Sequence, residues 1–297
     1  MIAINRQKVM ETFAEYTSHY NDQDPKIKLK IDHTYRVAEI SERIALWLKL
    51  PQEDVDLAWL IGMLHDIGRF EQLRRFGTFS DAQSIDHAQF GVELLYQEGL
   101  LKTYLPEEGS LQELPETGNQ QDSPEKEEKV EIQTEVNVNT LSIGKNEREI
   151  IRTAIWNHSA YRIEEGLDER TELFCHIIRD ADKIDILKVN HDVPIEDIYN
   201  VTTEELRQSQ VTPEVMEAFF EKHAVLRSLK KTPVDNIVGH SALVFELVYP
   251  VSYEIVQEQG YLEKILAFQS DNEVTGEQFA QLRECMGSHL EKMRNCQ

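Results

Sequence analysis

The sequence predicts an all-α protein, a helical bundle followed by an α-helical lobe, with one acidic insertion. Apolar residues recur at steps of three and four in nearly every well-patterned segment up to residue 190, which is the period of an amphipathic helix. The same pattern continues to the end of the chain. A length of 297 residues, of which 40% are hydrophobic and 29% charged, suits one large soluble domain with an accessory lobe.

Five helices are expected before residue 190. The first, 32–49, carries an apolar stripe and ends before Pro51. The second, 53–66, is strongly apolar, and Gly68 is a suitable stop signal. Ser84 or Asp86 can cap the third, which runs to about Gly99. The last two are 147–159 and 170–189.

A change in composition separates the third helix from the fourth. Residues 106–128 contain three prolines, two glycines and many Glu and Gln, which predicts a partly disordered acidic insertion over about 106–146. Within it, residues 130–138 alternate strictly between apolar and polar, so a short β-ribbon is an alternative there. We therefore expect a catalytic helical domain at 1–190 and a helical accessory lobe at 191–297. Helical patterns in this lobe cover 215–229, 241–259 and 276–293.

The charge and the termini limit the classes of partner. A formal net charge of -23 argues against a stable complex with duplex nucleic acid. It also means that a phosphorylated substrate needs a local cation, which a bound divalent metal would supply. No secretory signal or membrane-spanning stretch is recognised, and the three cysteines form no CxxC pair, so a cytoplasmic protein is expected. The oligomeric state is not predicted.

Several groups that could bind a metal lie on the apolar faces of these helices. His33 precedes Val37 by four residues, His158 follows Ile155 by three, and Asp182 follows Ile178 by four. Burial of such groups without a partner costs several kcal/mol, roughly 2–7, so a shared cation is indicated.

The strongest local motif is the pair His65-Asp66, at the end of the second helix. Both side chains can bend toward one cation at a helix end, and imidazole with carboxylate suits Mn, Fe, Ni, Co or Zn, with Mg as a further alternative.

In this arrangement the sequence resembles the HD superfamily of metal-dependent phosphohydrolases. The matching segments are IDHTYRVAEIS with His33, GMLHDIGRF with His65 and Asp66, and IIRDADKIDIL with Asp182. The resemblance covers roughly residues 30–190 and implies that these four residues bind the metal. Asp180 is the alternative to Asp182 as the last ligand.

The resemblance also implies roles for other residues. His87 and His158 are either ligands of a second metal or phosphate-contacting groups of a one-metal enzyme, and one tightly bound metal is slightly favoured. Asp66 and the cations Arg69 and Lys183 are expected to be catalytic. The substrate is expected to contact five residues: Arg36, Arg69, Arg75, His87 and His158. Arg74 is a further cation, and Glu71 or Asp86 could accept a proton, although surface positions are expected for both.

The function implied is hydrolysis of a phosphate ester or anhydride in a small phosphorylated molecule such as a nucleotide. The Gly-Tyr-Pro element of cyclic-di-GMP phosphodiesterases in this superfamily is missing after His158, and no second catalytic or sensor domain is found. The alternative is a regulatory protein that binds a metal or nucleotide without turnover. The presence of all four ligands favours the enzyme.

Overall fold

The computed structural model describes residues 4–105, 140–194 and 201–295, and side chains are not described for 140–145. Helices account for all the regular secondary structure in these ranges, which confirms the predicted all-α class. Residues 106–139, including the alternating stretch 130–138, lie outside the described residues. No helix in the described part of the chain is long and apolar enough to cross a membrane.

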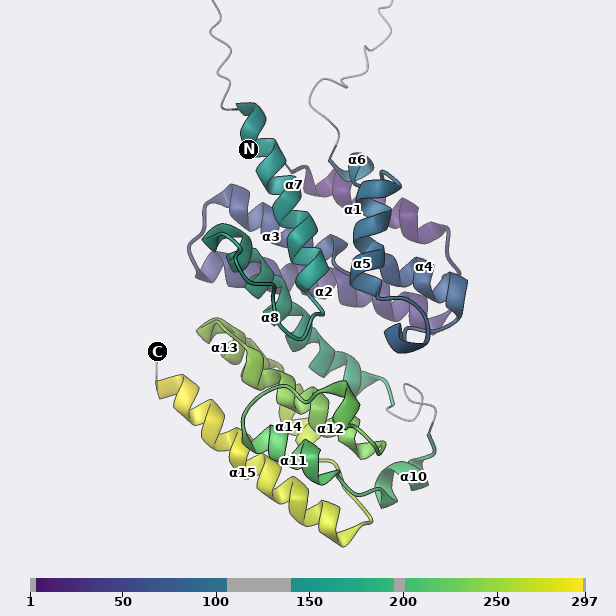
Figure 1. Ribbon diagram of the computed structural model, residues 1–297, viewed down its shortest axis with the longest axis vertical. Helices are drawn as coiled ribbons and strands as arrows, with labels where there is room; N and C mark the ends of the chain where they lie inside the picture. The colour runs from purple at the N-terminus through teal and green to yellow at the C-terminus, as the bar shows by residue number, and fades with distance from the viewer. Residues whose placement is uncertain (1–3, 106–139, 195–200, 296–297) are drawn as a thin grey trace, which may run out of the picture.

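The first group of helices forms one body around a shared core (Figure 1). It contains the five predicted helices and three that were not predicted. In chain order they are α1 (Arg6–Ser18), α2 (Pro25–Trp47), α3 (Gln52–Leu64), α4 (Ile67–Phe76), α5 (His87–Val92), α6 (Leu101–Tyr104), α7 (Thr140–Asn157) and α8 (Glu169–Asp192).

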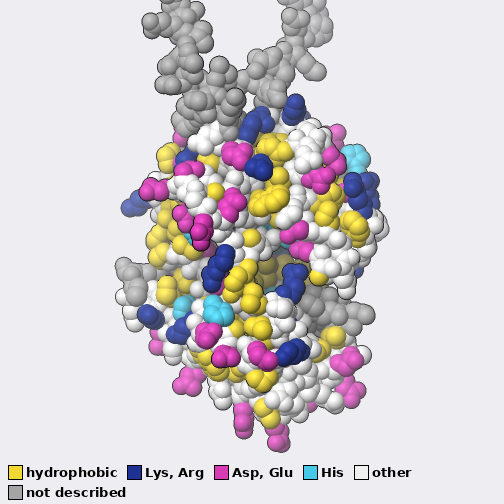
Figure 2. Space-filling view, in the orientation of Figure 1, with side chains coloured by type: hydrophobic (Ala, Val, Ile, Leu, Met, Phe, Trp, Pro, Cys, Tyr) yellow, Lys and Arg dark blue, Asp and Glu magenta, His cyan; other side chains and the backbone are white. Residues whose placement is uncertain are grey.

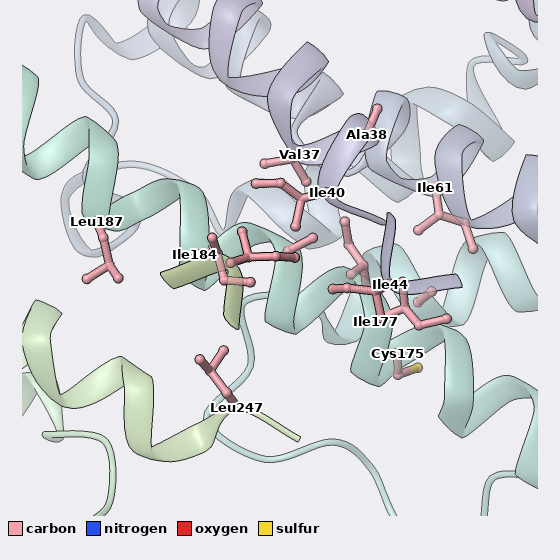
Figure 3. Packing of buried hydrophobic residues seen from close by; sticks show 14 of the residues in the cluster. Val37, Ala38, Ile40, Ile44, Ile61, Cys175, Ile177, Ile184, Leu187 and Leu247 are labelled. Atoms are coloured by element: carbon pink, nitrogen blue, oxygen red, sulfur yellow. The ribbon is translucent and has the colours of Figure 1, made fainter. Parts of the chain in front are cut away.

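Helices α2, α3 and α8 pack closely and form the centre of this body. A Cβ on Gly62 would lie 2.6 Å from the Cα of Ala38, so only glycine permits α3 to approach α2 this closely. Figure 3 shows the apolar side chains of α2, including Ile40 and Ile44, facing Ile177 and Ile184 of α8. This packing fixes the three helices that carry most of the predicted ligands.

Two boundaries differ from the prediction for identifiable reasons. Helix α2 begins at Pro25 because the Asp24 side chain accepts a hydrogen bond from the Lys26 amide. Helix α3 ends at Leu64, close to the predicted residue 66, but Gly68 is not its stop signal, because this glycine lies inside α4. Gly68 is needed for a close contact instead: a Cβ there would lie 2.5 Å from the carbonyl oxygen of His87.

Three of the remaining helices, 234–241, 250–259 and 261–266, pack against α8, and the helices 213–220 and 273–295 pack on these three (Figure 1). The predicted boundary at residue 190 falls near the end of α8, which belongs to the first body and also supports the second. The remaining helices are α10 (Thr203–Gln208), α11 (Pro213–Phe220), α12 (Val234–Ser241), α13 (Pro250–Gln259), α14 (Tyr261–Leu266) and α15 (Glu273–Asn295).

Candidate metal centre

The structure brings together all six residues predicted to bind one or two metals. His33 lies within α2, His87 begins α5, and Asp182 lies on α8. His65 and Asp66 connect α3 to α4, and His158 directly follows α7. Asp182 is slightly exposed and the other five are buried. The surface has a hollow near the middle of the face at the level of α2 and α8 (Figure 2).

Asp66 lies at the middle of the cluster, and its Oδ2 faces one pair of histidines. This oxygen is 3.5 Å from Nε2 of His33 and 3.6 Å from Nε2 of His65. Asp182 closes the same group, because its Oδ1 lies 3.2 Å from Nε2 of His33 and 3.8 Å from Nε2 of His65. We call this group the first position.

The other oxygen of Asp66 faces the second pair of histidines. Oδ1 is 3.4 Å from Nε2 of His87 and 3.7 Å from Nε2 of His158. The two Nε2 atoms are 3.0 Å apart. We call this group the second position. One carboxylate thus lies between two pairs of histidine nitrogens, and each of the two groups could hold a cation.

In each of the four histidine rings, the hydrogen bond made by Nδ1 determines which tautomer the neutral ring adopts, and so whether Nε2 carries a proton. Nδ1 of His33 donates to Asp185 at 2.6 Å, and Nδ1 of His87 donates to Asp81 at 2.9 Å. His65 and His158 both donate Nδ1 to the carbonyl three residues earlier, each at 2.7 Å. A neutral ring that donates from Nδ1 has a lone pair, and no proton, at Nε2.

The Nε2 atoms of the four rings therefore face one another in pairs, one pair at each position. The Nε2 atoms of His33 and His65 are 3.3 Å apart, and those of His87 and His158 are 3.0 Å apart. Burial lowers the pKa of His65 to about 3 and that of His87 to about 4, so these rings are neutral near pH 7. Imidazole nitrogens that face one another beside a carboxylate are suited to a divalent cation, and the residues fit such a metal.

At each position, an arginine donates hydrogen bonds to the carboxylate that accepts a hydrogen bond from one of the histidines. Arg36 donates two hydrogen bonds to Asp185, at 2.6 and 2.9 Å, and so orients the carboxylate that holds His33. Arg69 donates to Asp81 at 2.8 Å and so supports His87. Such carboxylate partners fix the tautomer and direction of a metal-binding ring. Asp81 and Asp185 were not assigned from the sequence, although Asp185 follows Asp182 by one helical turn.

Removing the charge of Asp185 or of Asp81 should weaken metal binding at one position and not at the other. Asp185→Asn should lower metal affinity at the first position, and Asp81→Asn at the second, each by about 10–100-fold, because the ring loses its charged acceptor. Calorimetric titration of metal-free protein with Mn²⁺ measures both steps. Asp192→Asn, a more exposed acid also on α8, serves as the control. Equal weakening of both steps by either variant would contradict the assignment of positions.

The positive groups around Asp66 include one that the sequence prediction missed. Nζ of Lys30 lies 2.6 Å from Oδ2 of Asp66, and Nε of Arg69 lies 3.5 Å from Oδ1. Burial opposes ionisation of Asp66, but the Lys30 ammonium holds the pKa of this carboxyl well below its usual range. Lys30 is three residues before His33, so its position on the same helical face was the available signal.

Two of the predicted cations lie near the cluster. Nε of Arg69 is buried and has no hydrogen-bond partner among the described residues, while its Nη1 donates to Gln72, Asp81 and the Phe79 carbonyl. Lys183 is next to Asp182 on α8, and burial lowers its pKa to about 8.

The other predicted polar residues are paired with residues outside the group of six candidate ligands. Arg36 is engaged by Asp185, as described above. Arg74 and Arg75 both pair with Glu71, which is 3% exposed, so the surface position expected for Glu71 is wrong. Asp86 caps α5 by accepting from the amides of Ala88 and Gln89, as the sequence predicted for a capping residue.

Asp180, the alternative to Asp182, faces away from the cluster. Its carboxylate accepts hydrogen bonds from the amides of Val248 and Tyr249 and from the Ser252 hydroxyl at 2.7 Å. These groups form the N-terminus of α13. Asp180 therefore joins α8 to the C-terminal helices, and the geometry favours Asp182 as the ligand.

Acid should destabilise the metal-free protein between about pH 6.5 and 4. The pKa values of His65 and His87, about 3 and 4, lie below the ordinary 6.5, so the unfolded chain binds protons in this window that the folded chain does not. The free energy of unfolding therefore falls as the pH falls. The pKa of His33 is raised by Asp182 and Asp185 against the effect of burial, so protonation of this ring partly offsets the decrease in the free energy of unfolding as the pH falls.

The test is the Tm of chelator-treated protein measured from pH 7.5 to 4.5. The expected result is a progressive decrease that is smaller in His87→Asn, which lacks one of the two lowered groups. A Tm independent of pH over this range would contradict the prediction.

Together, the fold and the cluster define an all-helical protein with a buried histidine and aspartate centre suited to divalent cations. The model of the HD domain family matches residues 31–187, more than half of the chain, so the protein belongs to the HD domain family. This family consists mostly of metal-dependent hydrolases. No curated protein and no solved structure matches the chain.

Proposed function

We propose that this protein is a phosphohydrolase that binds two divalent metals and cleaves a phosphate ester or anhydride in a small molecule. The observation that carries the proposal is the convergence of four imidazole Nε2 atoms on the two oxygens of Asp66. The mixed imidazole and carboxylate donors favour Mn, Fe, Ni, Co or Zn over Mg.

The two positions differ in the number of protein ligands. The first is surrounded by His33, His65, Asp66 and Asp182, and the second by Asp66, His87 and His158. Catalytic sites keep a position open for water or substrate, so the second position is the better place for the phosphate to enter. A bound metal lowers the pKa of water and polarises a phosphoryl oxygen.

Side chains of this chain supply the remaining functions. Asp66 holds both halves of the site at a fixed separation. Nε of Arg69 lies 3.5 Å from Oδ1 of Asp66 and has no hydrogen-bond partner among the described residues, so it is positioned to donate to a phosphate oxygen near the second position. Lys183 adds a positive charge next to Asp182, and its side chain makes no ion pair within the described ranges. These cations stabilise the negative charge that develops during transfer.

The substrate that we propose is a small phosphorylated molecule, with a nucleotide as the leading class. A net charge of -23 disfavours long polyanions, whereas a small phosphate can be bound by a local cluster of cations. We place the reaction in the cytoplasm, where the three cysteines would stay reduced.

A screen of nucleotides and generic phosphoesters with Mn²⁺, Co²⁺, Ni²⁺, Zn²⁺ and Mg²⁺ tests the proposal. Release of phosphate that requires a metal and is lost in Asp66→Ala is the expected result. Because HD proteins can also be non-catalytic, tight nucleotide binding without turnover under every metal would favour the regulatory alternative. Metal analysis should find about two equivalents after reconstitution.

A further inference from the structure

The ammonium of Lys30 binds the Asp66 oxygen that would bind a metal at the first position. Its ammonium donates to Oδ2 of Asp66 at 2.6 Å, and this oxygen also faces Nε2 of His33 and of His65. Asp66 is 3% exposed and Lys30 18%, so the bond lies at the inner edge of the site with a route to solvent on the lysine side.

A divalent cation at the first position and an ammonium on the same oxygen repel each other. In the metal-free protein, the ammonium provides the positive charge that a buried carboxylate requires. Once a metal supplies that positive charge, the carboxylate no longer requires the ammonium, and repulsion between the metal and the ammonium makes the contact between Lys30 and Asp66 unfavourable. Binding of the metal is therefore coupled to movement of this side chain.

The surroundings of Lys30 provide a place for the displaced ammonium. Nζ lies 5.7 Å from the centre of the Phe79 ring, and the Arg69 guanidinium lies 5.9 Å from the same centre. Aromatic faces attract cations at this range. The four-carbon stem of lysine is flexible, so the head can withdraw from Asp66 toward Phe79 without a backbone change.

We infer that Lys30 is a positioning residue with two states, an internal counterion of Asp66 in the metal-free protein and a phosphate-binding cation once the first metal is bound. This inference rests on the proposed function, because it assumes that a metal and a phosphate meet at this site. It explains how a chain with a net charge of -23 keeps a mobile positive group beside its centre.

The first test is calorimetric titration of chelator-treated protein with Mn²⁺. Lys30→Gln should bind the first equivalent about tenfold more tightly, because a competing charge-assisted hydrogen bond is removed. Lys28→Gln, at an exposed lysine on the same helix, should match the wild type. Unchanged or weaker binding by Lys30→Gln would overturn the displacement. A wild type that binds no metal would instead reject the proposed function.

The second test uses inorganic phosphate as the probe on protein saturated with Mn²⁺. Lys30→Gln should bind phosphate about tenfold more weakly than the wild type and Lys28→Gln. Tighter metal binding without a loss of phosphate affinity would show that Lys30 is only a counterion and would overturn its second state. Thermal unfolding of each metal-free variant checks that the fold is intact.

Discussion

Asp66→Asn should release both metals at once and reduce turnover by roughly 1,000-fold or more. Among the residues that the structure describes, this carboxylate is the one group that faces both positions, with Oδ2 toward His33 and His65 and Oδ1 toward His87 and His158. Asparagine keeps the shape but loses the charge and offers only one oxygen. Metal content after reconstitution with Mn²⁺ and desalting, measured beside phosphate release, gives the result.

Two single-histidine variants provide matched controls for Asp66→Asn. His33→Ala should lose the metal at the first position and retain part of the metal at the second. His158→Ala should lose the metal at the second position and retain part of the metal at the first. His176→Ala, at a partly exposed histidine paired with Glu172, should leave both in place. If Asp66→Asn kept two equivalents, Asp66 would not be the bridging residue, and the interpretation of the second position would fail with it.

Three of the candidate ligands could be predicted because they align with the apolar faces of predicted helices. A buried histidine or aspartate on such a face needs a partner, and this requirement is visible from spacing alone at His33, His158 and Asp182. The proposal of two metals could not be reached in this way, and the sequence slightly favoured one. It depends on which oxygen of Asp66 each histidine faces, and only the three-dimensional arrangement of α2, α5, α7 and α8 shows this.

The supporting residues could not be found in the same way because they act between distant segments. Asp185 is 152 residues from His33 in the chain, and Lys30 is 36 residues from Asp66. Gly68 was misinterpreted for a related reason. A glycine can end a helix or permit a close approach, and the neighbouring carbonyl of His87 that decides between these lies beyond the local sequence.

Replacing Asp180 and Asp182 separately should give opposite phenotypes. Asp180→Ala should lower the free energy of unfolding by about 3 kcal/mol, because two amides and a hydroxyl at the start of α13 lose their buried acceptor. Metal stoichiometry should stay unchanged in the part of the population that folds. Asp182→Ala should leave unfolding of the metal-free protein within about 1 kcal/mol of the wild type but weaken the first metal by about 10–100-fold.

Urea unfolding in chelator, together with Mn²⁺ titration of each variant, separates these outcomes. The two aspartates are one residue apart on the same helix, so a general effect of losing a carboxylate there would appear in both variants. Asp180→Asn keeps an acceptor for the amides of Val248 and Tyr249 and should recover part of the lost stability, since the cost comes from unsatisfied donors. Loss of the first metal in Asp180→Ala, with normal binding in Asp182→Ala, would reverse the ligand assignment. Asp182 would then have no role at the metal centre, and Asp180 would have to turn away from α13 to reach it.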